Sequence, residues 1–277
     1  MFPVLFSIGT FQFKTMSLFV LLAFFLASFI FWRKGREEHY SEADIFDGFL
    51  ISTLLGAVVA RAVFIFFNFD TFGFHIVSWF SLGAYPGTNL IAGLAAAAFY
   101  MYKNATKNKW DQFEVLDFWV TSAALGLSIY YLGTFFDGSG YGFATNLPWG
   151  VVFPQLIDPH HPVQLYFALF YTGLYFYLSK VEYSYRTFTW YRHGKKTAQT
   201  GFLTSAFLII VSVVTFVMAF LKPATLEFMG INFDMVISGG LALIGTSLLF
   251  SRSGRNLPFA PKRKVKPVLT KIEHLHE

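Results

Sequence analysis

Residues 16–38 read MSLFVLLAFFLASFIFWRKGREE, an apolar run that ends at Trp32 and is followed directly by a basic cluster. A helix of about 20 mostly apolar residues crosses the hydrocarbon core of a bilayer. Lys and Arg residues next to such a helix are retained on the cytoplasmic side. The stretch therefore predicts a membrane-spanning helix that starts outside the cell and enters the cytoplasm at Arg33.

The same alternation of apolar run and basic segment continues along the chain. Six further apolar runs cover residues 48–68, 82–102, 113–136, 163–179, 201–221 and 235–250. The segments after the first, third, fifth and seventh runs hold 18 of the 21 Lys and Arg residues, whereas the segments on the other side hold only Lys14 and Lys222. The pattern predicts an all-α polytopic membrane protein with seven transmembrane helices, its N-terminus outside and its C-terminus cytoplasmic. Residues 1–250 form the predicted seven-helix membrane domain, and residues 251–277 a basic cytoplasmic tail.

The composition supports a membrane protein and excludes several other classes. Only 13% of the 277 residues are charged, against about 25% in soluble domains. The net charge of +5 predicts no nucleic-acid partner, because the basic residues lie beside membrane ends, where they set topology and contact anionic lipid. There is no cysteine, which excludes disulfides, thiolate nucleophiles and cysteine metal sites. We find no spacing typical of metal ligands and predict neither a metal nor a cofactor.

Arg61 lies inside the second apolar run, about 13 positions from its cytoplasmic start, or roughly 20 Å into the membrane at 1.5 Å per residue. An arginine at the bilayer centre costs about 2.5–3.5 kcal/mol, so its side chain faces the bundle interior and has a partner. One interpretation is a guanidinium that holds a lipid phosphate by paired hydrogen bonds. The other is a structural arginine that pairs with a backbone carbonyl or with Asp137.

Further polar residues lie at the outer ends of the fourth and fifth runs. Asp137 either caps a turn or pairs with Arg61. His161 either acts as a general base near neutral pH or simply precedes a helix that begins with proline. Gln164 and Tyr166 follow on the first helical turn, and Gln164 is expected to point inward because a polar side chain that faces lipid is costly.

The stretch HPVQLY at 161–166 resembles the HPSQLYE motif of the prolipoprotein diacylglyceryl transferase family. Other stretches resemble motifs of the same family in the same order, namely PVLFSIG at 3–9, GAVVAR at 56–61 with FIFFN at 64–68, DF at 117–118, LGTFFDG at 132–138 and FP at 153–154. The resemblance covers about residues 3–250. The family also has seven spans with the N-terminus outside.

The resemblance implies a reaction, two substrates and a location. The family moves a diacylglyceryl group from phosphatidylglycerol to the thiol of a lipobox cysteine in a secreted prolipoprotein, in the bacterial cytoplasmic (inner) membrane. This chemistry needs a base for the thiol and cations for the leaving phosphate. By resemblance, His161 is the catalytic base and Arg61 the lipid-phosphate ligand. The supporting residues are Asp137, Gln164, Tyr166 and Tyr131.

The chain also departs from the family's motifs. The arginine of GRLGNF aligns with Tyr131, and the glutamate that ends HPSQLYE aligns with Phe167. The histidine of SxHGG is missing, since residues 85–88 read YPGT, and in the sixth span an arginine and a glutamate become Val214 and Met218. These losses support a second hypothesis, a catalytically silent relative that binds lipid or a lipoprotein precursor.

Two other cations and one other class of protein complete the picture. Lys14 and Lys222 lie on the side where the phosphate is expected, but nothing in the sequence fixes them there. An unrelated seven-span receptor, photoreceptor or transporter is the third hypothesis. Residues 235–250 contain no lysine for a retinal Schiff base, and the runs hold almost none of the buried carboxylates typical of proton-coupled transporters.

Overall fold

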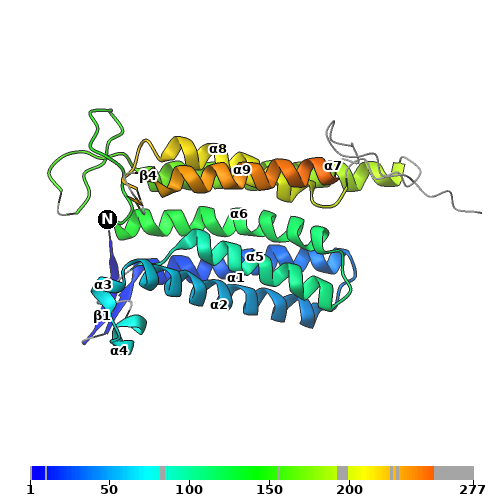
Figure 1. Cartoon of the computed structure of the whole chain (residues 1–277), viewed down its shortest axis with the longest axis horizontal. Coiled ribbons are helices and arrows are strands. Elements are labelled where there is room, and N and C mark those ends of the chain that lie inside the picture. Colours follow the sequence, from blue (N-terminus) through cyan, green and yellow to red (C-terminus); the bar gives the residue numbers. More distant parts are fainter. Residues whose placement is uncertain are drawn as a thin grey trace, which may run out of the picture.

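A computed structural model describes residues 2–9, 11–81, 85, 87–154, 156–191, 199–224, 227–228 and 231–252. The described chain is mostly helical, and its long helices lie nearly parallel (Figure 1). They are α1 (Thr15–Glu37), α2 (Glu42–Phe67), α5 (Leu90–Lys107), α6 (Gln112–Asp137), α7 (Val163–Tyr191), α8 (Phe202–Met218) and α9 (Phe233–Arg252). Nearly all of the predicted basic tail, residues 253–277, lies outside the described residues.

Each of the seven apolar runs coincides with one of these long helices. Among the described residues, α1, α2, α6 and α9 are long and apolar enough to cross a membrane, and α8 is a shorter apolar helix. The prediction of a helical membrane protein is therefore confirmed.

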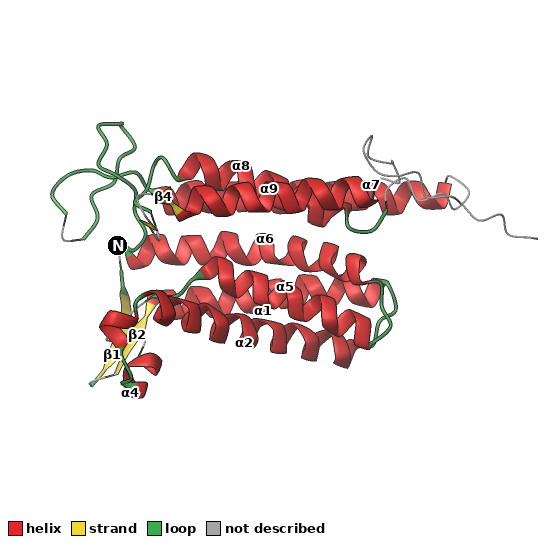
Figure 2. Ribbon diagram, viewed as in Figure 1, coloured by secondary structure: helices red, strands yellow, loops and turns green. Residues whose placement is uncertain are grey.

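Short elements gather at one end of the bundle (Figure 2). They are β1 (Val4–Ile8) and β2 (Phe11–Lys14), the helices α3 (Phe69–Phe72) and α4 (Ile76–Phe80), and β3 (Glu227–Phe228) with β4 (Ile231–Asn232). Both strand pairs are antiparallel. The protein is thus helical with two small hairpins rather than purely α-helical. We call this end, which also carries residues 138–162, the loop end.

The third apolar run becomes helical later than its hydrophobicity suggests. Its first residue is 82, but α5 begins at Leu90, after Asn89 has accepted a hydrogen bond from the Ala92 N–H at 3.0 Å. Gly87 precedes this cap with φ +141°, and a Cβ there would lie 2.2 Å from the Phe64 ring. The chain therefore passes Phe64 in a conformation that only glycine adopts easily, and this delays the helix.

The helices form two groups around α6. Figure 1 shows α1, α2 and α5 on one side of α6, and α7, α8 and α9 on the other. In the first group, α2 and α5 cross at Gly56 and Gly93, where a Cβ on either glycine would come within 2.8 Å of the other's carbonyl oxygen. Small residues allow such close contact between membrane helices. Thr121 and Ala124 of α6 are completely buried between the groups.

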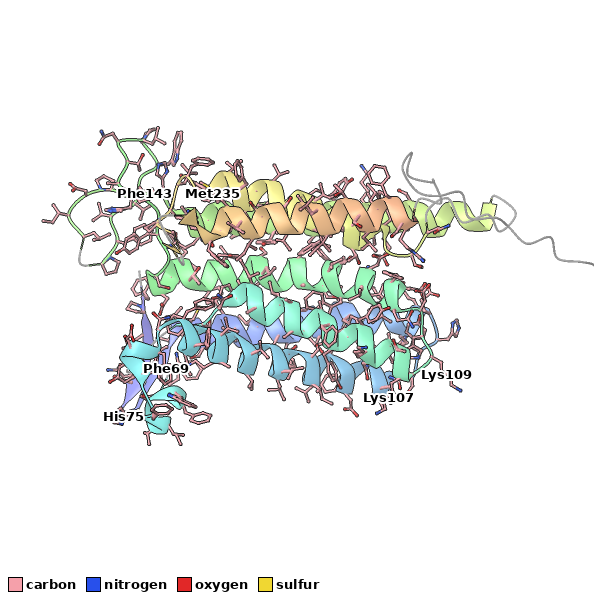
Figure 3. All side chains as sticks on the ribbon, viewed as in Figure 1. Phe69, His75, Lys107, Lys109, Phe143 and Met235 are labelled. Atoms are coloured by element: carbon pink, nitrogen blue, oxygen red, sulfur yellow. The ribbon has the colours of Figure 1, made fainter. Side chains whose placement is uncertain are left out.

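Polar contacts join the helices at the opposite end, which we call the basic end. The carboxylate of Asp117 on α6 accepts hydrogen bonds from the Gly201 and Thr204 N–H groups at 2.7 Å, and so caps the start of α8. Buried Lys34 on α1 forms an ion pair with Glu182 on α7. Figure 3 shows Lys107 and Lys109 at this end, far from Phe69, His75 and Phe143 at the loop end.

Candidate functional site

Arg61 projects from α2 into a ring of backbone carbonyls. Its Nε donates to the Trp79 oxygen at 2.8 Å, and Nη1 donates to the oxygens of Tyr85 and Gly87 at 2.9 and 2.8 Å. Nη2 donates to the Ser78 oxygen at 3.3 Å. The guanidinium therefore uses four of its five N–H groups to hold the segment between α4 and α5.

Two aromatic rings complete the surroundings of Arg61. Its guanidinium carbon lies 5.0 Å from the centre of the Phe72 ring and 5.7 Å from that of Phe64, within the range of cation–π attraction. Of the two sequence-based interpretations, the contacts match an arginine that pairs with backbone carbonyls. Within the described chain, no hydrogen bond or ion pair joins Arg61 to Asp137 or His161.

Asp137 is the last residue of α6, and a glycine turn follows it. Gly138 has φ +83° and ψ +15°, and both Gly138 and Ser139 donate to the Thr134 oxygen, at 3.0 and 3.1 Å. This is the usual way in which a left-handed glycine closes a helix. The Asp137 side chain makes no hydrogen bond to another described residue, so the cap is made by the backbone rather than by this carboxylate.

The backbone of His161 is locked into the loop end. Its N–H donates to the Phe143 oxygen at 3.0 Å, and its carbonyl accepts from the Gly142 N–H at 2.9 Å. His160 exchanges two hydrogen bonds with Val151 on the other side, at 2.9 and 3.0 Å. The two histidines thus sit in a small β-like lattice directly before α7, although the sequence indicates only a turn there.

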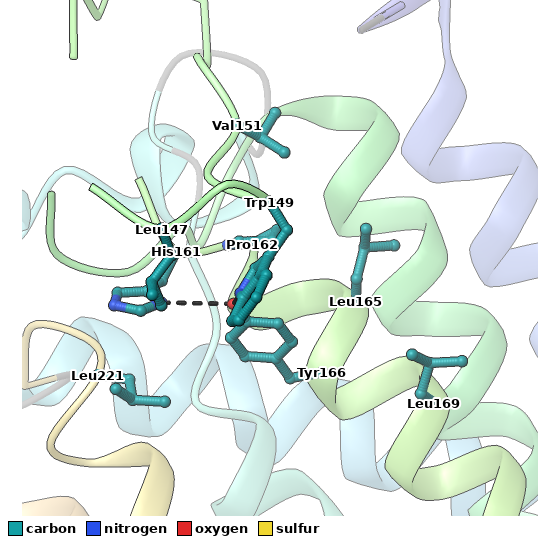
Figure 4. Close-up of a pocket in the computed structure, with 9 residues that line it drawn as sticks. All are labelled: Leu147, Trp149, Val151, His161, Pro162, Leu165, Tyr166, Leu169 and Leu221. Carbon is teal, nitrogen blue, oxygen red and sulfur yellow. Dashed lines mark hydrogen bonds between the residues drawn. The ribbon is translucent and has the colours of Figure 1, made fainter. Parts of the chain in front are cut away.

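The His161 ring belongs to a short hydrogen-bonded chain with two aromatic residues. Its Nδ1 lies 3.3 Å from the Tyr166 hydroxyl, and Trp149 Nε1 donates to that same hydroxyl at 2.9 Å. The dashed line in Figure 4 marks the His161–Tyr166 contact, and Nε2 makes no hydrogen bond to a described residue. The structure therefore brings His161 and Tyr166 together, as the shared motif suggests. The sequence did not point to Trp149; only its place in an apolar outer loop hints at a role.

An apolar pocket of about 580 Å³ surrounds this chain. Besides His161, Trp149 and Tyr166, its lining consists of Leu147, Val151, Pro162, Leu165, Leu169 and Leu221 (Figure 4). The lining comes from the loop, the first turns of α7 and the end of the α8 segment. A polar group that enters this pocket meets a histidine in a setting with little competing water.

Gln164 lies on the inward side of α7, as predicted. The side chain is 2% exposed, and its Nε2 donates to the Ser139 oxygen at 2.7 Å. Its Oε1 has no hydrogen-bond partner among the described residues. Gln164 thus ties α7 to the glycine turn after α6 and leaves one buried acceptor.

Tyr131 is part of an aromatic stack between α6 and α7. Its ring centre lies 4.7 Å from that of Phe167 and 5.7 Å from that of Tyr171, with interplanar angles of 19° and 7°. Positions 131 and 167 are those where the family's motifs carry arginine and glutamate. The chain has therefore replaced two charged groups by two rings that contact each other.

A second polar pair lies at the loop end, near the end of α8. Lys222 Nζ is 2.9 Å from Asp234 Oδ2 on the first turn of α9. The Asp234 side chain is 4% exposed and that of Lys222 is 21% exposed. The structure thus fixes Lys222, for which the sequence showed no partner, because its partner lies on the next helix. Among the described residues, no three His, Asp or Glu side chains are grouped so that they could hold a metal ion.

The fold and the site define a helical membrane protein whose loop end carries a histidine in an apolar pocket. Comparison with known proteins agrees with this class. The model of the family described as prolipoprotein diacylglyceryl transferase matches residues 3–251. The chain therefore belongs to this family.

Individual relatives cover most of the chain. A phosphatidylglycerol–prolipoprotein diacylglyceryl transferase of Thermotoga maritima is 25% identical over 271 residues, which cover 94% of this chain and 86% of the relative. The protein of the same name from Aeromonas hydrophila is 27% identical over 263 residues, 90% of this chain and 89% of the relative. That of Vibrio cholerae is 32% identical over 183 residues, 64% and 67% of the two chains.

Proposed function

We propose that this protein is a phosphatidylglycerol–prolipoprotein diacylglyceryl transferase, which moves a diacylglyceryl group to a lipobox cysteine during lipoprotein maturation. The family match over residues 3–251 supports the reaction. The observation that carries the proposal for this chain is the His161 ring, held by Tyr166 through Nδ1 inside an apolar pocket.

His161 is the proposed catalytic base. With its proton on Nδ1, the ring donates to the Tyr166 hydroxyl and leaves Nε2 to accept the proton of the substrate thiol. The thiolate then attacks the glycerol carbon of the lipid, a C–S bond forms, and the C–O bond to the phosphate breaks. The electron pair leaves with glycerol phosphate, and the proton passes from His161 to the leaving group or to water.

The remaining predicted residues support the site rather than react. Tyr166 orients His161, and Gln164 holds the glycine turn near Asp137 through Ser139. Tyr131 packs the α6–α7 interface. Phosphate binding by Arg61 stays a prediction, and its four carbonyl bonds favour a role as the anchor of the segment before α5.

The proposed topology has seven transmembrane helices, with the N-terminus and the loop end outside and the C-terminus in the cytoplasm. Residues 1–250 form the membrane domain and residues 251–277 a cytoplasmic tail. The segregation of 18 of 21 Lys and Arg residues supports this orientation. In a bacterial cytoplasmic membrane, phosphatidylglycerol and the secreted prolipoprotein then both reach the loop end.

The test is transfer of labelled diacylglyceryl from phosphatidylglycerol to a lipobox peptide by the purified, full-length protein in phosphatidylglycerol vesicles. His161→Ala is expected to lower the rate at least about 100-fold, the contribution of a general base. Arg61→Ala is expected to lower the rate through the displaced loop, and Arg61→Lys to restore little because one ammonium cannot reach four carbonyls. Lys107→Gln, at the basic end, is the matched control and keeps the rate.

A second candidate function follows from the aromatic stack. Tyr131 and Phe167 occupy positions where the family's motifs carry charges, and this favours a catalytically silent relative that binds lipid or a lipoprotein precursor. Absence of transfer by a folded protein that still binds phosphatidylglycerol would replace the first proposal by this one.

A further inference from the structure

We propose that the His161 pocket is the lipid site, with Lys222 as the cation that meets the phosphate of an anionic phospholipid and Leu165 and Leu169 in contact with one acyl chain. The inference rests on the proposed function and names the place and the phosphate ligand of its lipid substrate. It assigns a role to Lys222, which lies outside the motifs shared with the family.

Lys222 is held in one position at the rim of the pocket. Leu221 lines the pocket, and Lys222 is the next residue. Asp234 contacts the Lys222 ammonium at 2.9 Å, and this carboxylate is almost fully buried, whereas the Lys222 side chain is partly exposed. Asp234 thus holds the ammonium from the protein side and leaves its exposed side toward a ligand.

Hydrogen bonds place the Lys222 backbone close to His161. Phe143 links the two segments, since its N–H donates to the Leu221 oxygen at 2.9 Å and its carbonyl accepts from the His161 N–H at 3.0 Å. A Cβ on Gly142 would lie 2.3 Å from the Leu221 oxygen and 2.8 Å from His161 Cβ. The end of α8 and the start of α7 are therefore in contact here, and one phospholipid headgroup spans both.

The other cations of the loop end are poorer phosphate ligands. Arg61 already donates to four backbone carbonyls. Lys14 is exposed at the end of β2 and has no part in the pocket lining. Lys222 is the cation that directly follows a pocket residue and is fixed by a buried carboxylate.

The pocket continues as an apolar surface along α7. Leu169 is 73% exposed and Phe176 is 64% exposed on this helix. Gly173 lies between them, and a Cβ there would meet no atom within 4 Å. In a membrane this strip faces hydrocarbon, so an acyl chain that leaves the pocket along α7 stays in an apolar setting while its phosphate remains at the rim.

The experiment uses Trp149 as a reporter, because this side chain lines the pocket. Full-length protein is reconstituted in vesicles with brominated phosphatidylglycerol or, at equal mole fraction, brominated phosphatidylcholine. The quenching due to Trp149 is the difference between the protein and its Trp149→Phe variant. We expect Trp149 to be quenched preferentially by the anionic lipid, by about fivefold in apparent affinity, as for one lysine near an anionic lipid.

Variants of the cation test the assignment. Lys222→Gln is expected to abolish the preference and Lys222→Arg to retain it, whereas Lys107→Gln at the basic end leaves it unchanged. The double variant Lys222→Gln/Asp234→Asn removes the buried carboxylate that the single variant strands, so that loss of preference is measured in a protein without that defect.

Two results would overturn the proposal: equal quenching of the protein and its Trp149→Phe variant, or a preference that survives Lys222→Gln but disappears in Arg61→Gln. The measurement needs neither prolipoprotein nor turnover. A protein that fails to transfer diacylglyceryl but shows the Lys222-dependent preference therefore keeps the lipid site and loses only the proposed activity.

Discussion

At the scale of single residues, the exchange at Tyr131 and Phe167 explains how the chain has dispensed with two charges of its family. The rings stack at 4.7 Å in the interface of α6 and α7, and Tyr171 extends the stack. Stacked aromatic pairs contribute about 0.5–1.5 kcal/mol beyond their buried area. The two exchanges are coupled, because a charge at either position alone meets an aromatic ring in the membrane interior.

Tyr131→Arg is therefore expected to lower the free energy of unfolding by about 3 kcal/mol, the cost of a charge in the membrane. Adding Phe167→Glu is expected to recover about 1–3 kcal/mol through the new pair. Tyr131→Phe is the control and changes little, because the Tyr131 hydroxyl makes no hydrogen bond to a described residue. Unfolding in detergent, followed by circular dichroism, measures all three. Strictly additive effects of the two exchanges would contradict the coupling.

At the scale of elements, α8 depends on a carboxylate from another helix. Asp117 of α6 accepts from the N–H groups of Gly201 and Thr204 and from the Thr204 hydroxyl, at 2.6–2.7 Å. The first N–H groups of a helix have no partner within the helix. Because Asp117 is 7% exposed, water cannot easily replace it, and the shared Asp-Phe stretch acquires a structural explanation.

Asp117→Ala is accordingly expected to lower the unfolding free energy by about 2 kcal/mol, the upper range for a lost N-cap. Asp117→Asn is expected to cost less, because its amide oxygen still accepts from Thr204. The exposed Asp44, in the first turn of α2, serves as control through Asp44→Asn, which leaves stability unchanged. The same detergent unfolding assay measures the three variants, and equal losses for Asp117→Ala and Asp44→Asn would refute the buried cap.

At the scale of the whole molecule, charge separates the two ends of the bundle. The basic end carries Lys107 and Lys109, and the loop end carries the His161 pocket and the Lys222–Asp234 pair (Figure 3). Tyr40 stacks on Trp110 at 4.6 Å at the basic end, and burial there, together with Glu114, raises the pKa of Tyr40. Its hydroxyl thus stays protonated and donates to Glu114 at 2.5 Å.

The natural absence of cysteine allows a direct test of the orientation. Single cysteines are introduced by Ile157→Cys at the loop end, where Ile157 is 94% exposed, and by Lys107→Cys at the basic end. A membrane-impermeant maleimide added to intact cells is expected to label the first variant, and to label the second only after the membrane is opened. The reverse pattern would invert the proposed topology.

The sequence predicted the long helices well because hydrophobicity is a local property, recorded in consecutive residues. It was less accurate at their ends: α5 begins at Leu90 because Gly87 must pass Phe64, a contact between separate helices. It also missed the N-terminal and C-terminal hairpins as paired strands. The motif at 161–166 predicted the pairing of His161 with Tyr166, since these residues are one helical turn apart.

Apolar runs and flanking charges, together with the shared motifs, were sufficient to derive a helical membrane protein of this family from the sequence alone. Only the tertiary structure decided what the polar residues contact. Arg61 meets carbonyls up to 26 positions away, Trp149 reaches Tyr166, and Asp234 on α9 fixes Lys222. The physical reason is that burial in lipid depends on local composition, whereas a hydrogen bond or ion pair depends on how helices distant in sequence are packed together.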